Sequence, residues 1–459
     1  MTGLQQSAGN STVDALGSGA EAAEARRGRK RLRVLVLSHM HPKVSHGGAE
    51  IAAYQLYRQV KASPGVESWF VAASGGKVQS RLGTPFAQPF GPDEYVYCGH
   101  GFDHFIHANQ DTNFPRALTT LLTTLRPDVV HLHHYTNFGV EVFLHIRRAL
   151  PQARIVLTLH EFLGICNHFG QMVKRPSFFL CNAASAHDCA RCFPEKTEQD
   201  FFLRELYLKR FFGLVDHFVS PSQFLLDRYV AWGLPAARMS MVENGMPEPE
   251  NGLALPPEPE HHGAEGLVLG FFGQVSRLKG VNVLIDAARM LETDGVTGVR
   301  FEVYGDYSNQ PQAFRDDFDR RLADAPGNFR FMGPYENSRV RSLMQGVDAV
   351  MVPSVWWENS PLVIQEAFTA RRPVICSDIG GMAEKVRDGV DGFHFRAGNP
   401  ASLAALARRL AKEPQRLRAL SATIAVPPTI RETSRTMLKL YRRLVHGNAR
   451  DAAMSQEIE

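Results

Sequence analysis

Two glutamates flank a predicted helix start in the segment VPSVWWENSPLVIQEAFTARRPVICSD. Glu358 lies in the loop before the helix, and Glu366 lies about one and a half turns inside it. Ser360 suits the N-cap and Pro361 suits the first helical position, where an N–H would have no helical partner. The free amides of such a helix start bind phosphate, aided by the helix dipole. The two carboxylates could then reach hydroxyls on opposite sides of that phosphate, as a nucleotide-diphosphate sugar requires.

Two series of short apolar runs alternate with helix-length stretches along the chain. The first series predicts strands at 33–38, 128–134, 154–160 and 216–220, and helices at 49–60, 115–125 and 140–150. The second predicts strands at 267–273, 301–305, 329–333, 348–354 and 373–377, and helices at 281–291 and 361–371. Near-continuous apolar strands separated by helices are typical of parallel, doubly wound sheets. The sequence therefore predicts an α/β protein with two Rossmann-like domains, whose ligands bind between them at the carboxyl ends of the strands.

The domain boundaries are predicted from shifts in composition. A segment rich in Pro, Glu and Gly indicates a linker, and an amphipathic stretch after Pro427 and Pro428 indicates a last helix. The predicted units are a disordered, basic-ended tail (1–30), an N-terminal domain (31–246) with an insertion (161–200), a linker (247–265), a C-terminal domain (266–427), a terminal helix (428–446) and a flexible tail (447–459).

The composition excludes several classes of protein. The chain has 459 residues, of which 44% are hydrophobic and 21% charged, and these values exclude a largely disordered, collagen-like or small disulfide-rich protein. A formal charge of +4 gives no reason to expect nucleic acid as a partner. No apolar run is long enough to span a membrane, and the N-terminal segment lacks the apolar core of an export signal. We therefore expect a cytoplasmic protein with reduced thiols.

Basic residues gather at two places in the sequence. One group ends the N-terminal tail: Arg26, Arg27, Arg29, Lys30, Arg31 and Arg33. The other lies partly on one face of the predicted terminal helix: Arg431, Arg435, Lys439, Arg442 and Arg443. Solvated surface is one interpretation of both groups, and contact with anionic lipid at the inner membrane face is the other.

Three blocks in the C-terminal half resemble the family 4 retaining glycosyltransferases of GT-B fold. Glu358 and Glu366, with seven residues between them, resemble the E-x7-E motif of that family. CSDIGGMAEKVRDGVDGFHF (376–395) resembles its GG-x-x-E-x-V-x-D-G-x-x-G block, and GFFGQVSRLKGVNVLIDAA (270–288) resembles its G-x-L-x-x-x-K-G loop. The blocks follow the family's order and cover most of residues 265–400, so the resemblance implies the GT-B fold, with two Rossmann-like domains facing a central cleft.

The resemblance implies roles for residues on the donor side of that cleft. Glu366 would bind the ribose hydroxyls, and Glu358 would contact the donor sugar near the reacting carbon. Lys279 would bind the diphosphate and offset charge on the leaving group. The main chain at the helix start would line the sugar and the β-phosphate through Asn359, Ser360 and Leu362.

One position departs from the family pattern. The family usually has an arginine after the glycine of the phosphate-binding loop, where this chain has Gln274. Arg277, three residues further on, is the candidate for the second cation. The departure also keeps open a second hypothesis, a non-catalytic GT-B relative that acts as a binding or partner subunit.

The N-terminal half resembles the family at two shorter places. SHGGAE (45–50) resembles its glycine loop, in which Gly47 and Gly48 would let a phosphate or sugar approach the main chain; two ordinary turn glycines are the alternative. His160 ends the run RIVLTLH and resembles the family's T-x-H, near the donor sugar. The neighbouring predicted strand ends in three further histidines, His131, His133 and His134. A structural role is the alternative for each histidine.

The resemblance further implies a retaining hexosyltransferase. A UDP- or GDP-linked hexose would pass to a hydroxyl of a glycan or lipid-linked acceptor, as in polysaccharide biosynthesis. Cationic side chains and helix amides would stabilise the departing diphosphate, so neither a catalytic metal nor another cofactor is expected. The leaving phosphate would take the acceptor's proton during attack on the same face. Another GT-B enzyme, such as a nucleotide-sugar epimerase, is an alternative that the E-x7-E motif disfavours.

Four cysteines lie within the insertion. Cys189 and Cys192 form a C-x-x-C pair, whereas Cys166 and Cys181 are widely spaced. Four reduced thiols could hold a structural zinc in tetrahedral geometry, while unpaired thiols, or a disulfide or redox role, are the alternatives. Because the insertion begins directly after His160, we expect it to shape the acceptor site.

Overall fold

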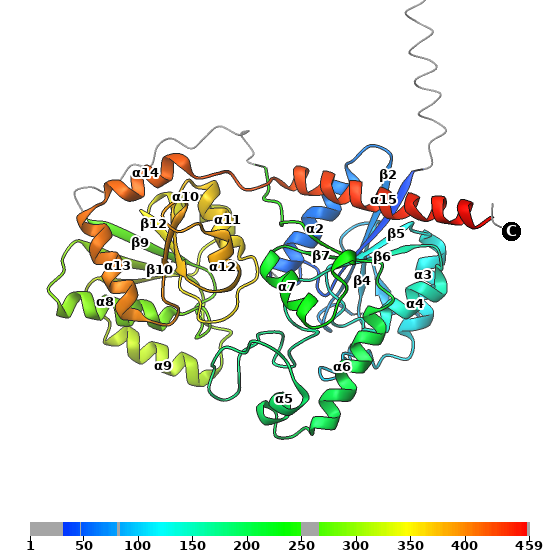
Figure 1. Ribbon diagram of the computed structural model, residues 1–459, viewed down its shortest axis with the longest axis horizontal. Coiled ribbons are helices and arrows are strands. Elements are labelled where there is room, and N and C mark those ends of the chain that lie inside the picture. The colour runs from blue at the N-terminus through cyan, green and yellow to red at the C-terminus, as the bar shows by residue number, and fades with distance from the viewer. Residues whose placement is uncertain (1–30, 46, 80–82, 249–265, 457–459) are drawn as a thin grey trace, which may run out of the picture.

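The computed structural model describes residues 31–45, 47–79, 83–248 and 266–456. These residues form two α/β domains that lie side by side, each built on its own sheet (Figure 1). The predicted tail (1–30) and most of the predicted linker (247–265) lie outside the described residues.

The N-terminal domain is built on an eight-stranded sheet of order β3-β4-β2-β1-β5-β6-β7-β8, in which every neighbouring pair except β3 with β4 is parallel. Its strands are β1 (Leu32–Ser38), β2 (Val66–Ala73), β3 (Phe86–Ala87), β4 (Glu94–Tyr97), β5 (Val129–Leu132), β6 (Arg154–Thr158), β7 (His217–Ser220) and β8 (Met239–Met241). Its helices are α2 (Gly48–Lys61), α3 (Phe114–Leu125), α4 (Val142–Ala149), α5 (Ala186–Cys192), α6 (Glu198–Phe212), α7 (Gln223–Ala231) and the short η1 (Ala236–Arg238).

The C-terminal domain is built on a six-stranded parallel sheet of order β11-β10-β9-β12-β13-β14. Its strands are β9 (Leu267–Phe272), β10 (Val299–Tyr304), β11 (Phe329–Gly333), β12 (Ala349–Val352), β13 (Val374–Ser377) and β14 (Gly392–Phe395). The helices that follow the linker are α8 (Val281–Thr293), α9 (Gln312–Ala323), η2 (Asn337–Arg339), α10 (Val340–Gln345), α11 (Leu362–Thr369), α12 (Gly380–Lys385), α13 (Pro400–Lys412), α14 (Gln415–Thr423) and α15 (Ile430–Gln456).

Burial on both faces explains why the strands are almost continuously apolar. In β1, Leu35 and Leu37 pack into the cluster on one face of the sheet, while Val34 and Val36 pack into the cluster on the other. All four side chains are fully buried. Each burial of this kind contributes about 1.5–3 kcal/mol to folding, so a polar residue at any of these positions would be costly. The two-sided parallel sheet predicted from the apolar runs is thus confirmed.

The terminal helix α15 returns from the C-terminal domain and lies along the N-terminal domain (Figure 1, red). Met437, Leu438, Leu440 and Tyr441 are buried in the cluster that also holds the outer face of β1. The Tyr441 hydroxyl is 2.6 Å from Nδ1 of the buried His131. The helix continues to Gln456, past its predicted end at residue 446.

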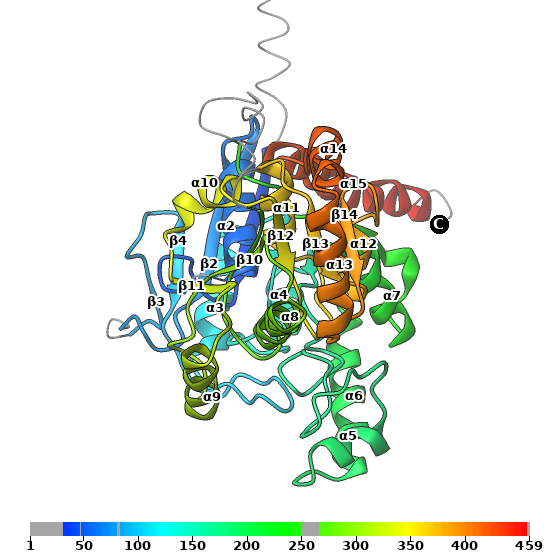
Figure 2. The same cartoon turned by 90° about the vertical axis from the view of Figure 1, so that its left-hand side faces the viewer.

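The insertion after β6 begins against the N-terminal sheet, where Phe162, Ile165 and Met172 are buried in its core cluster. Its loop leads into α5 and α6, which project below the body of the molecule in Figure 1 and again in the turned view of Figure 2. Within the described ranges, no helix has both the length and the apolar character needed to cross a membrane.

Candidate active site

The two domains enclose a cavity of about 360 Å³ at the carboxyl ends of the strands. Loops that follow β1, β5 and β6 form its N-terminal wall, and the loops before α8 and α11 form its C-terminal wall. Of the predicted site residues, seven line it: Gly48, His160, Lys279, Glu358, Asn359, Ser360 and Leu362. Seven residues predicted from two distant parts of the chain thus lie around one cavity.

The centre of the C-terminal wall is an ion pair between Lys279 and Glu358. Lys279 Nζ lies 2.6 Å from Glu358 Oε1. The same oxygen accepts hydrogen bonds from Ser354 Oγ at 2.8 Å and Trp356 Nε1 at 2.9 Å. Glu358 is 6% exposed, so three donors compensate its burial and fix its orientation. The ion pair thereby positions Lys279 Nζ at the edge of the cavity.

Lys279 reaches this position because a glycine follows it. Gly280 has φ +77°, and a Cβ at that residue would lie 1.9 Å from the carbonyl oxygen of Pro353. The glycine thus lets the loop before α8 pass against the end of β12, which brings Lys279 beside the loop that carries Glu358. This contact is the structural reason for the K-G pair in the sequence.

Two helix starts point into the cavity from opposite domains. Gly48, Ala49 and Glu50 line it at the first turn of α2, and Leu362 lines it at the first turn of α11. The first amides of a helix have no carbonyl partner within it and can bind an anion. The predicted cap at α11 was off by one position, because Pro361 is the N-cap and the Ser360 hydroxyl instead accepts a hydrogen bond from Lys385.

Glu366 lies in the second turn of α11 and outside the residues that line the cavity. Burial raises the pKa of its carboxyl group to about 7. In the part of the chain that the structure describes, this carboxylate makes no hydrogen bond or ion pair. The side chain is only half-buried, so this carboxyl group is open to a ligand.

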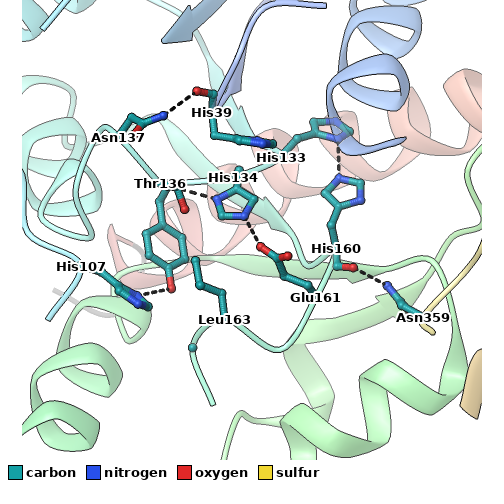
Figure 3. A network of polar contacts seen from close by, with 12 residues as sticks. His39, His107, His133, His134, Thr136, Asn137, His160, Glu161, Leu163 and Asn359 are labelled. Atoms are coloured by element: carbon teal, nitrogen blue, oxygen red, sulfur yellow. Dashed lines mark hydrogen bonds and ion pairs between the residues drawn. The ribbon is translucent and has the colours of Figure 1, made fainter. Parts of the chain in front are cut away.

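Three histidines, His39, His134 and His160, line the N-terminal wall (Figure 3). His160 Nε2 is 3.0 Å from His133 Nδ1, and its main-chain oxygen accepts a hydrogen bond from Asn359 Nδ2 at 3.0 Å. Burial, helped by the nearby His134, lowers the pKa of His160 to about 3. His160 is therefore a neutral imidazole at neutral pH, and it is fixed to both domains.

A carboxylate follows His160 directly and pairs with the other cavity histidine. The Thr136 amide donates to His134 Nδ1 at 3.0 Å, so His134 carries its proton on Nε2 and donates it to Glu161 Oε1, 2.5 Å away. Burial alone would raise the pKa of Glu161, but the hydrogen bond from His134 and the other nearby imidazoles hold it below its usual value. Glu161 is thus an anion whose side chain is 37% exposed and lines the cavity.

A second carboxylate is held in the same way. His39 Nε2 lies 3.3 Å from Glu50 Oε1, and the rings of His39 and His134 are 4.4 Å apart. Burial opposes ionisation of Glu50, yet the hydrogen bond with His39 lowers its pKa below the usual value. The N-terminal wall therefore presents two fixed negative charges, opposite the lysine of the C-terminal wall.

Both halves of the chain match known families. Residues 46–248 match Glycosyltransferase Family 4, and residues 266–413 match the family described as Glycosyl transferases group 1. The lipopolysaccharide 1,2-N-acetylglucosaminetransferase of Salmonella typhimurium is 28% identical over 187 residues, which are 39% of this chain and 48% of that protein. The D-inositol 3-phosphate glycosyltransferase of Mycobacterium leprae is 32% identical over 190 residues, or 39% and 42% of the two chains. The chain thus matches less than half the length of each relative.

Solved structures match over nearly the whole chain. Anabaena HepE in complex with UDP and glucose covers 89% of this chain and 99% of its own, with a TM-score of 0.59 and 17% identity. Sucrose-phosphate synthase from Thermosynechococcus elongatus covers 91% and 100%, with a TM-score of 0.66 and 16% identity. The chain has the GT-B fold of glycosyltransferases. Together, the family matches and this fold support a GT-B glycosyltransferase, as the sequence motifs predicted.

Within this GT-B cleft, Arg277 does not lie where it was expected. Its guanidinium group stacks on the ring of Phe178, 4.1 Å from the ring centroid, and Arg277 is not among the residues that line the cavity. Gln274 is also exposed and outside the cavity. Because Phe178 belongs to the insertion, Arg277 links the C-terminal domain to the insertion, and Lys279 is the basic residue of the loop before α8 that lines the cavity.

Three other predicted residues lie behind the cavity surface. Gly47 is the N-cap of α2, and a Cβ there would lie 2.3 Å from a carboxylate oxygen of Glu50. His131 is fully buried between Tyr441 and Thr158, at 2.6 Å and 2.7 Å. His133 is buried behind His160. Gly47 and His133 thus contact residues that line the cavity, whereas His131 joins β5 to β6 and α15.

The sequence analysis missed two acidic residues of the cleft. Glu50 is the last residue of the quoted SHGGAE segment, and Glu161 follows the T-x-H histidine. A polar residue directly after a predicted strand was the available signal for Glu161, because the carboxyl ends of parallel strands converge on the site. No pattern in the sequence around Glu50 indicates a role in the site. Its ionisation and orientation depend on His39, which it meets only in the folded protein.

The predicted zinc site in the insertion is not supported. Cys166, Cys181, Cys189 and Cys192 are all unpaired, and no three metal-binding side chains among the described residues are arranged to hold an ion. Burial raises the pKa of Cys166 to about 11 and also raises that of Cys181 and Cys189. These surroundings favour thiols over the thiolates that zinc requires. The alternative of unpaired thiols fits this arrangement.

Proposed function

We propose that this chain is a retaining glycosyltransferase that moves a hexose from a nucleotide-diphosphate sugar to a hydroxyl of a glycan or lipid-linked acceptor. The observation that carries the proposal is the Lys279–Glu358 pair, joined at 2.6 Å beside the start of α11 in the cavity between two glycosyltransferase-family domains. A cation beside unpaired helix amides suits a diphosphate, and an adjacent fixed carboxylate suits a sugar hydroxyl.

The proposed reaction exchanges one bond at the anomeric carbon for another. The bond from that carbon to the diphosphate oxygen breaks, and a bond to the acceptor oxygen forms on the same face. The acceptor proton passes to the leaving phosphate, so no protein base is required. Lys279 and the amides at the start of α11 stabilise the charge that develops on the diphosphate. In this proposal those groups replace a catalytic metal.

The position of Glu366 supports a nucleoside as the part of the donor on the far side of the diphosphate from the sugar. Its carboxylate lies on α11, the helix whose start would hold the phosphate, and it has no partner among the described residues. A ribose diol can donate two hydrogen bonds to one carboxylate. HepE was solved with UDP and glucose, which favours UDP as the first nucleotide to test.

The acceptor side of the proposal rests on the N-terminal wall. Glu50 and Glu161 are anions that would repel phosphate but would accept hydrogen bonds from sugar hydroxyls. Gly170 of the insertion also lines the cavity, and Trp357 Nε1 donates to the Cys181 carbonyl across the cleft at 2.9 Å. These contacts support the proposal that the insertion shapes the acceptor site.

Calorimetric titration with UDP, GDP and ADP, each with and without EDTA, tests the donor assignment. We expect one nucleotide to bind clearly more tightly than the others, with an affinity that EDTA does not change. Slow hydrolysis of the matching nucleotide sugar would separate an enzyme from the alternative, a non-catalytic binding subunit. Anomer analysis of the released sugar by NMR would then test retention. Loss of binding in EDTA would overturn metal independence.

We also propose peripheral contact with anionic lipid at the inner membrane face. The exposed basic residues of α15 support it: Arg431, Arg435, Lys439, Arg442 and Arg443. The opposite face of the helix is buried on the N-terminal domain, so these cations are presented outward. Co-sedimentation with vesicles of phosphatidylcholine and phosphatidylserine tests this, and equal binding to vesicles of phosphatidylcholine alone would contradict it.

A further inference from the structure

The block GGMAEK (380–385), at helix α12, lies against the loop that carries Glu358 and Asn359. The Gly381 amide donates to the main-chain oxygen of Glu358 at 2.8 Å. A Cβ on Gly381 would lie 1.5 Å from the main-chain oxygen of Asn359, so only glycine permits this contact. The two glycines thus attach α12 directly to residues 358–360, which we call the donor loop.

Glu384, in the same short helix, reaches into the other domain. Its two carboxylate oxygens accept hydrogen bonds from the amides of Gln223 and Phe224, at 2.8 Å and 2.6 Å. These amides belong to the first turn of α7, where no helical carbonyl can pair with them. Glu384 therefore caps a helix of the N-terminal domain from the C-terminal domain, where the helix dipole favours its charge.

Lys385 makes two contacts, one to each side of the domain boundary. Its ammonium group forms an ion pair with Glu243 of the N-terminal domain. The same Nζ donates to Ser360 Oγ of the donor loop at 2.8 Å. Only 12% of the Lys385 side chain is exposed, so both contacts are largely shielded from water. A buried ammonium that loses either partner is strongly disfavoured, which makes the two contacts interdependent.

The donor loop is held by the N-terminal domain as well. Asn359 accepts a hydrogen bond from Ser222 Oγ and donates to the main-chain oxygen of His160. Behind the loop, a second cavity of about 370 Å³ is lined by Ser360, Lys385 and Glu243. The donor loop therefore lies between two sets of contacts that both cross the domain boundary.

We propose that Lys385 is a positioning residue that couples closure of the two domains to the shape of the donor loop. The ion pair with Glu243 holds the domains together, and the bond to Ser360 transmits that position to the loop that would meet the donor phosphate and sugar. Glu384 also holds the two domains together, because it caps α7 of the N-terminal domain. This inference rests on the proposed donor site, and it adds an interdomain function for the GG-x-x-E-K block.

Burial and charge around Lys385 agree with this role. Burial lowers its pKa, and the adjacent Glu243 opposes that shift together with Glu384. Arg387 and Asp391, which line the same cavity, pair with each other through two bonds of 2.6 Å and 2.7 Å. Glu243 is accordingly the anion that pairs with Lys385 across the domain boundary.

Two readouts test the proposal on the full-length protein: UDP affinity by calorimetry and the radius of gyration by small-angle scattering without ligand. We expect Lys385→Ala to weaken UDP binding at least tenfold and to enlarge the radius. Lys412→Ala, which removes an exposed lysine from α13, is the matched control and should change neither. Wild-type values of both quantities in Lys385→Ala would overturn the proposal. A melting curve for each variant reports its folding, and Glu243→Gln gives the same test from the partner side.

Ser360→Ala separates the two contacts of Lys385, because it removes the bond from Nζ and leaves the ion pair with Glu243. We expect the radius of gyration to stay at the wild-type value while UDP affinity falls. Wild-type UDP affinity in this variant would show that Lys385 only holds the domains together and would overturn its positioning role.

Hydrogen exchange tests the Glu384 contact without any nucleotide. The amides of Gln223 and Phe224 should exchange faster in Glu384→Ala, and unchanged exchange would remove Glu384 from the proposal. If the wild-type protein binds no nucleotide, the proposed function fails. The scattering and exchange results would still decide whether the block closes the domains, so the two failures are distinguishable.

Discussion

The two walls of the cleft use opposite chemistry. The C-terminal wall presents Lys279 beside the start of α11, and its carboxylate, Glu358, has one oxygen occupied by three donors. The N-terminal wall presents the neutral imidazole of His160 and two anions, Glu50 and Glu161. One wall therefore suits a phosphate, and the other suits hydroxyls.

The walls also differ in how far apart their parts lie in the sequence. Most of the C-terminal wall comes from one continuous segment that the sequence motif covers. The N-terminal wall joins the ends of β1, β5 and β6. Its ion pairs, such as His134 with Glu161, form only when the sheet brings these ends together. Most of the proposed phosphate side can therefore be predicted from one continuous segment. The proposed hydroxyl side depends on the order in which the strands pair.

Of the substitutions in the two walls, Lys279→Ala should reduce activity the most. Loss of the cavity cation should reduce kcat/KM for the nucleotide sugar about 10²- to 10³-fold, as for other groups that stabilise developing charge. Arg277→Ala is the matched control, because Arg277 stacks on Phe178 outside the cavity, and its loss should be much smaller. A coupled assay of nucleoside diphosphate release measures both. Equal losses would contradict the assignment of the phosphate site to Lys279.

Glu161→Gln should have the next largest effect, on the opposite wall. It removes the anion that His134 orients, so transfer or hydrolysis should fall about tenfold, the scale of a hydrogen bond to a charged group. UDP affinity should not change, because the hydroxyl side does not meet the nucleotide. Glu195→Gln removes an exposed glutamate from the insertion and serves as the control. A matching loss of UDP affinity in Glu161→Gln would move Glu161 to the donor side.

The pH dependence of UDP binding should show Glu366 titrating. Its pKa of about 7 implies that ribose, which needs the ionised carboxylate as acceptor, binds several-fold more tightly at pH 8 than at pH 6. Folding favours the protonated form, so the stability from Glu366 is present below pH 4.5 and is lost as the pH rises through 7. Calorimetry across this range measures the slope, which should disappear in Glu366→Gln. A slope that persists in that variant would assign the titration to another group.

Tyr441→Phe should give the smallest effect, because it acts behind the N-terminal wall. Removing the hydroxyl leaves His131 Nδ1 without its partner from α15 and should cost about 1 kcal/mol of unfolding free energy. Urea unfolding measures this, and UDP affinity should stay close to that of the wild type. Tyr307→Phe, at an exposed hydrogen bond in the C-terminal domain, should cost less. An equal cost at both positions would contradict the proposed importance of burial.

Much of the fold could be predicted because a strand that is buried on both faces appears in the sequence as a continuous apolar run. The runs that became β1, β5, β6 and β9 are apolar on both faces, and this pattern distinguishes a parallel sheet from a half-exposed one. The zinc site, one of the alternatives for the four cysteines, is not supported, and sequence spacing could not have decided it. The spacing of four cysteines says nothing about where their sulfur atoms point or how far burial raises their pKa values.

The sequence by itself determined the two-domain α/β architecture and two separate segments, one with Lys279 and Gly280 and one with Glu358. These depend on apolar periodicity and on motifs that are each short and continuous in the chain. Only the tertiary structure decided that Arg277 stacks on the insertion and that Glu161 is an anion of the cavity. It also decided that Lys385 crosses the domain boundary. The physical reason is that charge, burial and partner at these residues are set by side chains far away in sequence, which meet only after the domains have packed.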